Sequence, residues 1–78
     1  MTNLEKYKQA FTEALELQGE PFESLVYGES ERWDSVAHMT LVASLEDAFD
    51  IMLDMDDIID LSSFEKGKEI LQKYDVEL

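Results

Sequence analysis

Ser35 is the side chain best placed for chemistry, because its hydroxyl lies where a loop is expected to turn into a helix. The surrounding residues read Trp33-Asp34-Ser35-Val36-Ala37-His38-Met39, and apolar residues then continue at helical spacing to Phe49. A hydroxyl at such a corner is a natural site for attaching a covalent group. A serine in the first turn of a helix can also act as a cap, although Asp34 already fills that role. The residues alone leave both interpretations open.

Ser35 and His38, three residues apart on a helix, can approach each other and suggest nucleophilic catalysis. The chain, however, has no glycine-rich turn to supply oxyanion donors, and 78 residues leave little room for a catalytic pocket. We therefore expect a protein that is not an enzyme, with His38 exposed or half-buried near a partner surface. Trp33 is either a ligand-stacking residue or a structural lid on the bundle, and we favour the lid.

Metal and thiol chemistry lack the residues that they need. The chain contains no cysteine, which excludes disulfides, thiolate catalysis and cysteine–zinc sites. Asp54, Asp56 and Asp57, with Glu65 further on, invite comparison with a calcium-binding loop, but Ile59 stands where such a loop requires glycine. We predict no dedicated metal site.

The charge of the chain is strongly and unevenly negative. Nineteen acidic residues face six basic ones, which gives a net charge of −13, and no lysine or arginine lies between Trp33 and Phe64. Such a surface repels nucleic acid and anionic lipid and speeds encounter with basic protein patches. No apolar run approaches the roughly 18 residues of a membrane span, and the N-terminus does not resemble a signal peptide. We expect one cytoplasmic domain over residues 1–78.

The first helix is predicted over residues 3–17. Thr2-x-x-Glu5 is a capping box, and apolar residues follow it at spacings of three and four. Gly19 marks the end of the helix. Residues 18–33 keep no sustained period but are too apolar for a free linker. We expect a long loop anchored on the bundle by Phe22, Leu25 and Tyr27.

The second helix, Ser35–Phe49, is predicted to have two apolar sides. Asp34 is a good N-cap, and its charge suits the helix dipole. One side is a core stripe made of Leu41, Leu45, Ala48 and Phe49. The other side, which we call the outward strip, consists of Val36, Met39, Ala43 and Asp47. In so small a domain we expect the outward strip to face a partner.

A short third helix and a longer fourth helix follow. Asp56 or Asp57 is predicted to cap the third helix, which carries core residues at Ile58, Ile59 and Leu61. Ser62-x-x-Glu65 is a second capping box and predicts the fourth helix over about residues 63–74.

Gly67 lies inside the fourth helix and is expected to weaken it by roughly 1 kcal/mol relative to alanine. No segment shows the two-residue alternation of a strand. We therefore assign an all-α fold, a four-helix bundle with a long loop between the first two helices.

The residues around and after Ser35 resemble the second helix of acyl carrier proteins. The matching elements are Asp34-Ser35-Val36, then Leu41-Val42, Leu45-Glu46 and Phe49-Asp50-Ile51. The likeness runs without gaps from Asp34 to about Leu71, and the length and acidity of the chain agree with the family. The Trp33 form of the motif, with His38-Met39, is similar to specialised stand-alone carriers outside core fatty-acid synthesis.

The resemblance implies that a phosphopantetheinyl transferase attaches 4′-phosphopantetheine from coenzyme A to Ser35 through a phosphodiester. The thiol of that arm would hold acyl groups as thioesters, and Asp34 would help bind the transferase and its metal ion. The protein would be a monomer that carries acyl intermediates from a loading ligase to acyl-processing or acyl-transfer enzymes with basic docking patches. The docking residues carried over from the family are Val36, Met39, Ala43, Glu46 and Asp47.

Several positions depart from the family pattern. Ala37 and Thr40 stand where acids are frequent, and His38 lies between them, which implies dedicated partners in a specialised lipid, polyketide, secondary-metabolite or polysaccharide pathway. Asp54 replaces a frequent proline and Gly67 a small apolar residue, and both are expected to loosen the third and fourth helices. A mobile third helix and the loop between the first two helices would shelter a cargo chain between Leu41, Leu45, Ile58 and Leu61.

Two other functions fit parts of the pattern. A peptidyl or aminoacyl carrier would use Ser35 in the same way for an activated amino acid, although the acidity of the chain argues against it. A non-carrier acidic helical module would bind basic proteins without covalent chemistry. That alternative explains the charge and the outward strip, but it gives no role to the motif at Ser35.

Overall fold

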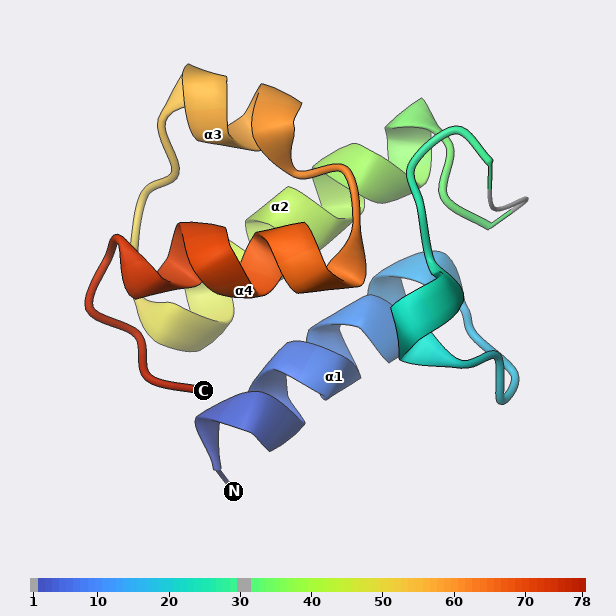
Figure 1. Ribbon diagram of the computed structural model, residues 1–78, viewed down its shortest axis with the longest axis horizontal. Coiled ribbons are helices and arrows are strands. Elements are labelled where there is room, and N and C mark those ends of the chain that lie inside the picture. The colour runs from blue at the N-terminus through green and yellow to red at the C-terminus, as the bar shows by residue number, and fades with distance from the viewer. Residues whose placement is uncertain (1, 30–31) are drawn as a thin grey trace.

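Four α-helices form the frame of the computed structural model, which describes residues 2–29 and 32–78 (Figure 1). They are α1 (Asn3–Leu15), α2 (Ser35–Phe49), α3 (Met55–Asp60) and α4 (Phe64–Gln72), with a 3₁₀ turn, η1 (Phe22–Ser24), in the loop after α1. The described residues contain no β-strand, only an isolated bridge between Val26 and Ser63. The predicted all-α fold, with its short third helix, is confirmed. No helix in these residues has the length and apolarity needed to cross a bilayer.

The start of α1 follows the predicted capping box. The Thr2 hydroxyl accepts a hydrogen bond from the Glu5 backbone N–H at 3.1 Å, and the Glu5 carboxylate accepts one from the Thr2 backbone N–H at 3.1 Å. The helix ends at Leu15, two residues before the predicted end, because Glu16 adopts a left-handed backbone with φ 52°. The Asn3 side chain donates to the Glu77 carbonyl at 2.9 Å, which holds the two chain ends together.

The bounds of α2 match the prediction, Ser35 to Phe49. The Asp34 carboxylate accepts from the Ala37 backbone N–H at 2.8 Å and so caps the helix. On the inner side Leu41 and Leu45 are 0% and 1% exposed, and the predicted core stripe is confirmed at these two positions. Ala48 and Phe49, at the end of the stripe, are half-buried.

An aromatic cluster fills the centre of the bundle. Tyr7, Phe11, Trp33 and Phe64 are each at most 1% exposed. The Phe11 ring packs edge-to-face on Trp33 at 5.3 Å and on Phe64 at 5.1 Å between centroids. Such pairs add roughly 0.5–1.5 kcal/mol each to the burial of the rings. Trp33 is therefore a structural residue, as favoured from the sequence, but it lies in the core instead of covering it.

The loop between α1 and α2 is anchored by the apolar residues that the sequence singled out. Leu25 is 3% exposed, and the Phe22 ring packs on Phe64 at 4.9 Å. Tyr27 is 37% exposed, but its backbone N–H donates to the Ser62 carbonyl at 2.8 Å. The loop is thus fastened to the link between α3 and α4. Residues 30 and 31 of the predicted loop lie outside the described part.

The predicted cap of α3 is wrong, and its predicted core face is wrong at Ile59 but confirmed at Leu61 and, as a half-buried residue packed on the core, at Ile58. Asp54, not Asp56 or Asp57, occupies the N-cap position, although its side chain makes no capping bond. Ile59, predicted in the core, is 70% exposed, whereas Leu61 is 1% exposed. Neighbouring residues on a helix point about 100° apart, so Ile58 and Ile59 cannot both face inward. The inward position next to them is taken by Asp57, which is only 5% exposed.

The predicted start of α4 is wrong by one residue. Ser63, not Ser62, is the N-cap, and its hydroxyl accepts from the Lys66 backbone N–H at 3.0 Å. Ser62 instead contacts the loop, because its carbonyl accepts a hydrogen bond from the Tyr27 backbone N–H. The helix ends at Gln72, two residues early, because a tight turn follows in which the Tyr74 N–H donates to the Leu71 carbonyl at 3.0 Å.

Gly67 has a different role from the one predicted. A Cβ atom at this position would lie 2.0 Å from the Tyr7 hydroxyl oxygen and 2.9 Å from a methyl carbon of Leu61. The missing side chain therefore lets α4 pack directly against α1. Packing therefore opposes the gain in helix propensity that alanine would bring at this position.

Candidate functional site

Ser35 is the first residue of α2, and its side chain is exposed. Within residues 2–29 and 32–78, its hydroxyl takes part in no hydrogen bond. Because Asp34 caps the helix, the serine is not needed for that purpose. The hydroxyl is thus open to an enzyme, on a turn whose backbone is fixed. These properties fit the covalent attachment of a bulky group.

His38 is buried, and its predicted exposure is wrong. The residue is 6% exposed, and its Nδ1 accepts a hydrogen bond from the Trp33 indole N–H at 3.0 Å. Its Nε2 lies 2.8 Å from the Ile58 carbonyl oxygen. The Tyr27 ring stacks on the imidazole at 4.7 Å. Because both ring nitrogens have partners, His38 is not available as a base for Ser35.

The outward strip lies on the surface, as predicted. Val36 is 74% and Met39 is 57% exposed, and Ala43 and Asp47 are exposed as well. Glu46, also predicted as a docking residue, is half-buried, and its carboxylate accepts from the Leu53 backbone N–H at 2.9 Å. Its side chain therefore holds the link after α2, which the sequence did not indicate.

Sequence reasoning missed the apolar residues that α3 exposes. Met55 and Ile59, four residues apart on one face of this helix, are 76% and 70% exposed. The contact between His38 and the Ile58 carbonyl places α3 beside the first half of α2. The spacing of four between Met55 and Ile59 was the available signal, but a pair of adjacent isoleucines is more typical of a core.

An open groove of about 570 Å³ lies between α1 and α2, and its lining includes Asp34 and Val36, the two neighbours of Ser35 in the sequence. Apolar residues such as Ala14 and Ala37 line it together with acids at the end of α1. Arg32 also lines it, but its guanidinium is engaged by the Glu20 carboxylate at 2.6 Å. The predicted cargo region is closed by comparison. Leu41, Leu45 and Leu61 are each at most 1% exposed, so a cargo chain there requires α3 to move.

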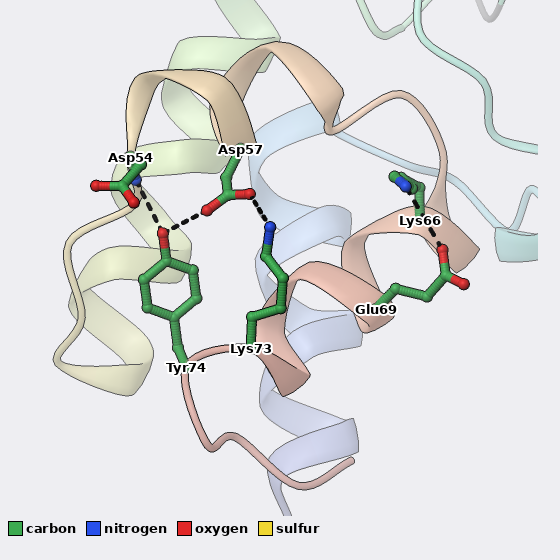
Figure 2. Close-up of polar contacts among 6 residues, drawn as sticks. All are labelled: Asp54, Asp57, Lys66, Glu69, Lys73 and Tyr74. Atoms are coloured by element: carbon green, nitrogen blue, oxygen red, sulfur yellow. Dashed lines mark hydrogen bonds and ion pairs between the residues drawn. The ribbon is translucent and has the colours of Figure 1, made fainter.

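Asp57, one of the acids that invite comparison with a calcium-binding loop, forms an ion pair with Lys73. In the described part of the chain, no group of three histidine, aspartate or glutamate residues is placed to hold a metal ion. Asp57 instead accepts from the Lys73 ammonium and from the Tyr74 hydroxyl, both at 2.5 Å (Figure 2). We call these three residues the Asp57 clamp. The clamp joins α3 to the turn after α4.

Asp54 contributes to the same clamp through its backbone. Its N–H donates to the Tyr74 hydroxyl oxygen at 3.0 Å (Figure 2). Proline, frequent here in the family that the sequence resembles, has no N–H to donate. The Asp54 N–H thus makes a hydrogen bond to the turn after α4 that proline at this position would remove.

The Asp57 clamp predicts how stability depends on pH. The hydrogen bond from Lys73 above all, and then that from Tyr74, lower the pKa of Asp57. The same bonds to Asp57 raise the pKa of Lys73 and of Tyr74. Because the pKa of Asp57 is lower in the folded state, its charged form stabilises the fold at pH values above the usual aspartate pKa of about 4. This contribution is lost as the pH falls through the folded-state pKa of Asp57. The raised pKa values stabilise the fold below about pH 10, and that contribution is lost in stronger base.

We expect Asp57→Asn to lower the urea midpoint at pH 7 and to reduce the loss of stability between about pH 5 and pH 2. Urea titrations across this range measure both effects. Asp56→Asn is the matched control, since Asp56 is an exposed acid of the same helix. A parallel pH profile in the wild type and Asp57→Asn would contradict the assignment.

Asp34 gives a second prediction, which separates capping from charge. Asp34→Ala is expected to lower the free energy of unfolding by about 1 kcal/mol, because the Ala37 N–H loses its partner. Asn is as good an N-cap as Asp, so Asp34→Asn is expected to retain the stability and lose only the charge. Urea denaturation of the two variants tests this, and equal destabilisation by both would contradict it.

Comparisons with protein-family models, curated proteins and solved structures return no match for this chain. Function is therefore inferred from the motif around Ser35 and from the geometry of its turn. That geometry comprises an exposed hydroxyl, a capped helix start and an apolar strip on the same helix.

Proposed function

We propose that this protein is an acyl carrier protein that holds acyl intermediates on a 4′-phosphopantetheine arm attached to Ser35. The observation that carries the proposal is the exposed hydroxyl of Ser35, which has no hydrogen-bond partner among the described residues, at the first position of α2 and within the Asp34-Ser35-Val36 motif. The all-helical bundle and its short third helix agree with the acyl-carrier type. The protein itself is a carrier and not an enzyme, and it works in the cytoplasm.

Ser35 takes part in one chemical step. Its Oγ attacks the phosphorus of coenzyme A that bears the pantetheine, and the Oγ–P bond forms. The bond from that phosphorus to the bridging pyrophosphate oxygen breaks, and adenosine 3′,5′-bisphosphate leaves. The hydroxyl proton passes to a base of the transferase. Once attached, the arm supplies a terminal thiol for thioester formation, which a chain without cysteine cannot supply.

The partners are enzymes with basic and apolar docking surfaces. They comprise the phosphopantetheinyl transferase, an acyl-loading ligase and acyl-processing or acyl-transfer enzymes. A net charge of −13 attracts basic patches from a distance, and Val36 and Met39 offer apolar contacts one turn or less from Ser35. Ala37 and Thr40, neutral at positions that are often acidic in the family, make this surface suited to dedicated partners of a specialised pathway.

A non-carrier interaction module is the second candidate. The exposure of Val36 and Met39 favours it equally, because an apolar strip within an acidic surface binds basic amphipathic partners without covalent chemistry. This function would not depend on the Ser35 hydroxyl. Partner binding that is unchanged in Ser35→Ala, together with no modification of the wild type, would select it.

Intact-protein mass spectrometry tests the carrier role. After incubation with coenzyme A and a broad-specificity phosphopantetheinyl transferase, the wild type is expected to gain the mass of one phosphopantetheinyl group. Ser35→Ala is expected to gain nothing, because the attacking oxygen is missing. Ser62→Ala, which removes an exposed serine outside α2, is expected to be modified like the wild type.

The carrier role would be refuted by no mass gain in the wild type while the transferase modifies a known carrier in the same tube. A gain that persists in Ser35→Ala would refute Ser35 as the site. Loading of the modified protein by acyl ligases or by amino-acid-activating enzymes then separates an acyl carrier from an aminoacyl carrier.

A further inference from the structure

The imidazole of His38 makes two different hydrogen bonds in a buried position. The indole N–H of Trp33 can only donate, so Nδ1 of His38 accepts this bond, which is 3.0 Å long. The proton of the neutral ring therefore lies on Nε2, which donates to the Ile58 carbonyl at 2.8 Å. Nδ1 thus bonds to the residue before the α2 cap, and Nε2 bonds to α3.

The hydrogen bond between Trp33 and His38 links side chains on either side of Ser35 in the sequence. Trp33 precedes the serine by two residues and His38 follows it by three, so the bond between their side chains spans the start of α2. Trp33 is 0% exposed and packs on Phe11 of α1, which fixes one end of the span in the core. The backbone of the turn is held from inside, while the Ser35 side chain is exposed.

The hydrogen bond between His38 and the Ile58 carbonyl attaches α3 to α2. Six residues are too few for an independently stable helix, so α3 depends on its contacts with the rest of the bundle. Met55 and Ile59 face solvent and contribute little. Within residues 2–29 and 32–78, the bond from His38 to Ile58 is the one hydrogen bond that joins α2 to α3. The Asp57 clamp holds the other side of α3 to the turn after α4.

We infer that His38 is a positioning residue with two separable roles: its Nδ1 fixes the Ser35 turn through Trp33, and its Nε2 fastens α3 over the core. Because the bonds use different nitrogens, the Ile58 carbonyl of α3 can detach from His38 while the turn keeps its shape. An opening of α3 that exposes Leu41 and Leu61 then leaves the attachment site intact. The relevance of this opening to a cargo rests on the proposed function, whereas the two bonds do not.

Amide and indole hydrogen exchange of the unmodified protein, followed by NMR, tests the separation. The Trp33 indole N–H reports on the turn, and the Leu61 N–H, which is bonded to the Asp57 carbonyl at 3.0 Å, reports on α3. The slowest α1 amides report global unfolding and provide the reference. The ¹⁵N shifts of His38 are expected to show an unprotonated Nδ1 and a protonated Nε2.

Three variants at His38 distinguish the two roles. Asparagine places an acceptor near the Nδ1 position. His38→Asn is therefore expected to retain slow exchange of the Trp33 indole N–H and to speed exchange of the Leu61 N–H about tenfold. Glutamine places a donor near the Nε2 position. His38→Gln is therefore expected to speed exchange of the Trp33 indole N–H about tenfold and to retain slow exchange of the Leu61 N–H. His38→Leu, which fills a similar volume without polar atoms, is expected to speed both.

Two results would overturn the inference. His38→Leu that exchanges like the wild type at both reporters would show that the ring only fills space. Asparagine and glutamine variants with the same changes at both reporters would show a general packing defect instead of two roles. Since none of these measurements uses coenzyme A or a transferase, their outcome is independent of the mass-spectrometric test at Ser35.

Discussion

Gly67→Ala is expected to lower the free energy of unfolding by about 3 kcal/mol, the upper part of the usual range for overpacking a core. The new methyl group would stand 2.0 Å from the Tyr7 hydroxyl oxygen, far inside contact distance. Tyr7 cannot easily turn away, because it is 0% exposed and its hydroxyl donates to the Phe64 carbonyl at 2.5 Å. The gain of roughly 1 kcal/mol from the better helix propensity of alanine does not offset this clash.

Urea denaturation of four proteins isolates the cause. They are the wild type, Gly67→Ala, Tyr7→Phe and the double variant. Tyr7→Phe alone is expected to cost about 1 kcal/mol, since the Phe64 carbonyl loses its donor. In the Tyr7→Phe background the oxygen is absent, so Gly67→Ala is expected to cost clearly less than in the wild type. Equal costs in both backgrounds, or stabilisation by Gly67→Ala, would contradict the packing argument.

Gly67 shows which part of the fold local patterns can predict. The bounds of α2 and its cap at Asp34 follow from residues within one turn of each other, and the structure confirms both. The role of Gly67 depends on Tyr7, sixty positions earlier in the chain. Intrinsic propensity carries no information about such a neighbour, so it presents the glycine only as a weakness of the helix.

The same distinction applies to the candidate site. The position of Ser35, its exposure and the outward strip follow from the helix period, which the sequence contains. The burial of His38 does not, because its partners are the indole of Trp33 and a carbonyl of α3. A histidine in an amphipathic helix, five residues after a tryptophan, is compatible with a buried or an exposed position. Only the packing of α3 decides between them.

Asp57 is a further case in which a distant partner overrides the pattern. A run of acids in a short helix is typical of a solvated face, yet Asp57 is buried and Ile59 is exposed. Lys73 and Tyr74 supply the hydrogen bonds that a buried carboxylate requires. The resulting rotation of α3 turns Met55 and Ile59 toward solvent, beside the half of α2 that carries Val36 and Met39.

Met39→Lys is expected to reduce kcat/KM for the phosphopantetheinyl transferase by about 30-fold, which corresponds to a hot-spot loss near 2 kcal/mol. Met39 lies one turn from Ser35 and is 57% exposed, so a docked enzyme must cover it. A lysine there replaces an apolar contact with a positive charge that faces a basic partner. The fold is expected to tolerate the change, because the side chain makes no core contact.

Met52→Lys is the matched control for this prediction. It makes the same change of residue and charge at a methionine that is 84% exposed and lies beyond the far end of α2. Both variants change the net charge equally, so both are expected to lose the same small part of long-range steering, a loss that added salt removes. Only Met39→Lys is expected to retain its deficit at high salt. Equal rates for the two variants at all salt concentrations would show that the charge of the protein, and not the outward strip, recruits the enzyme.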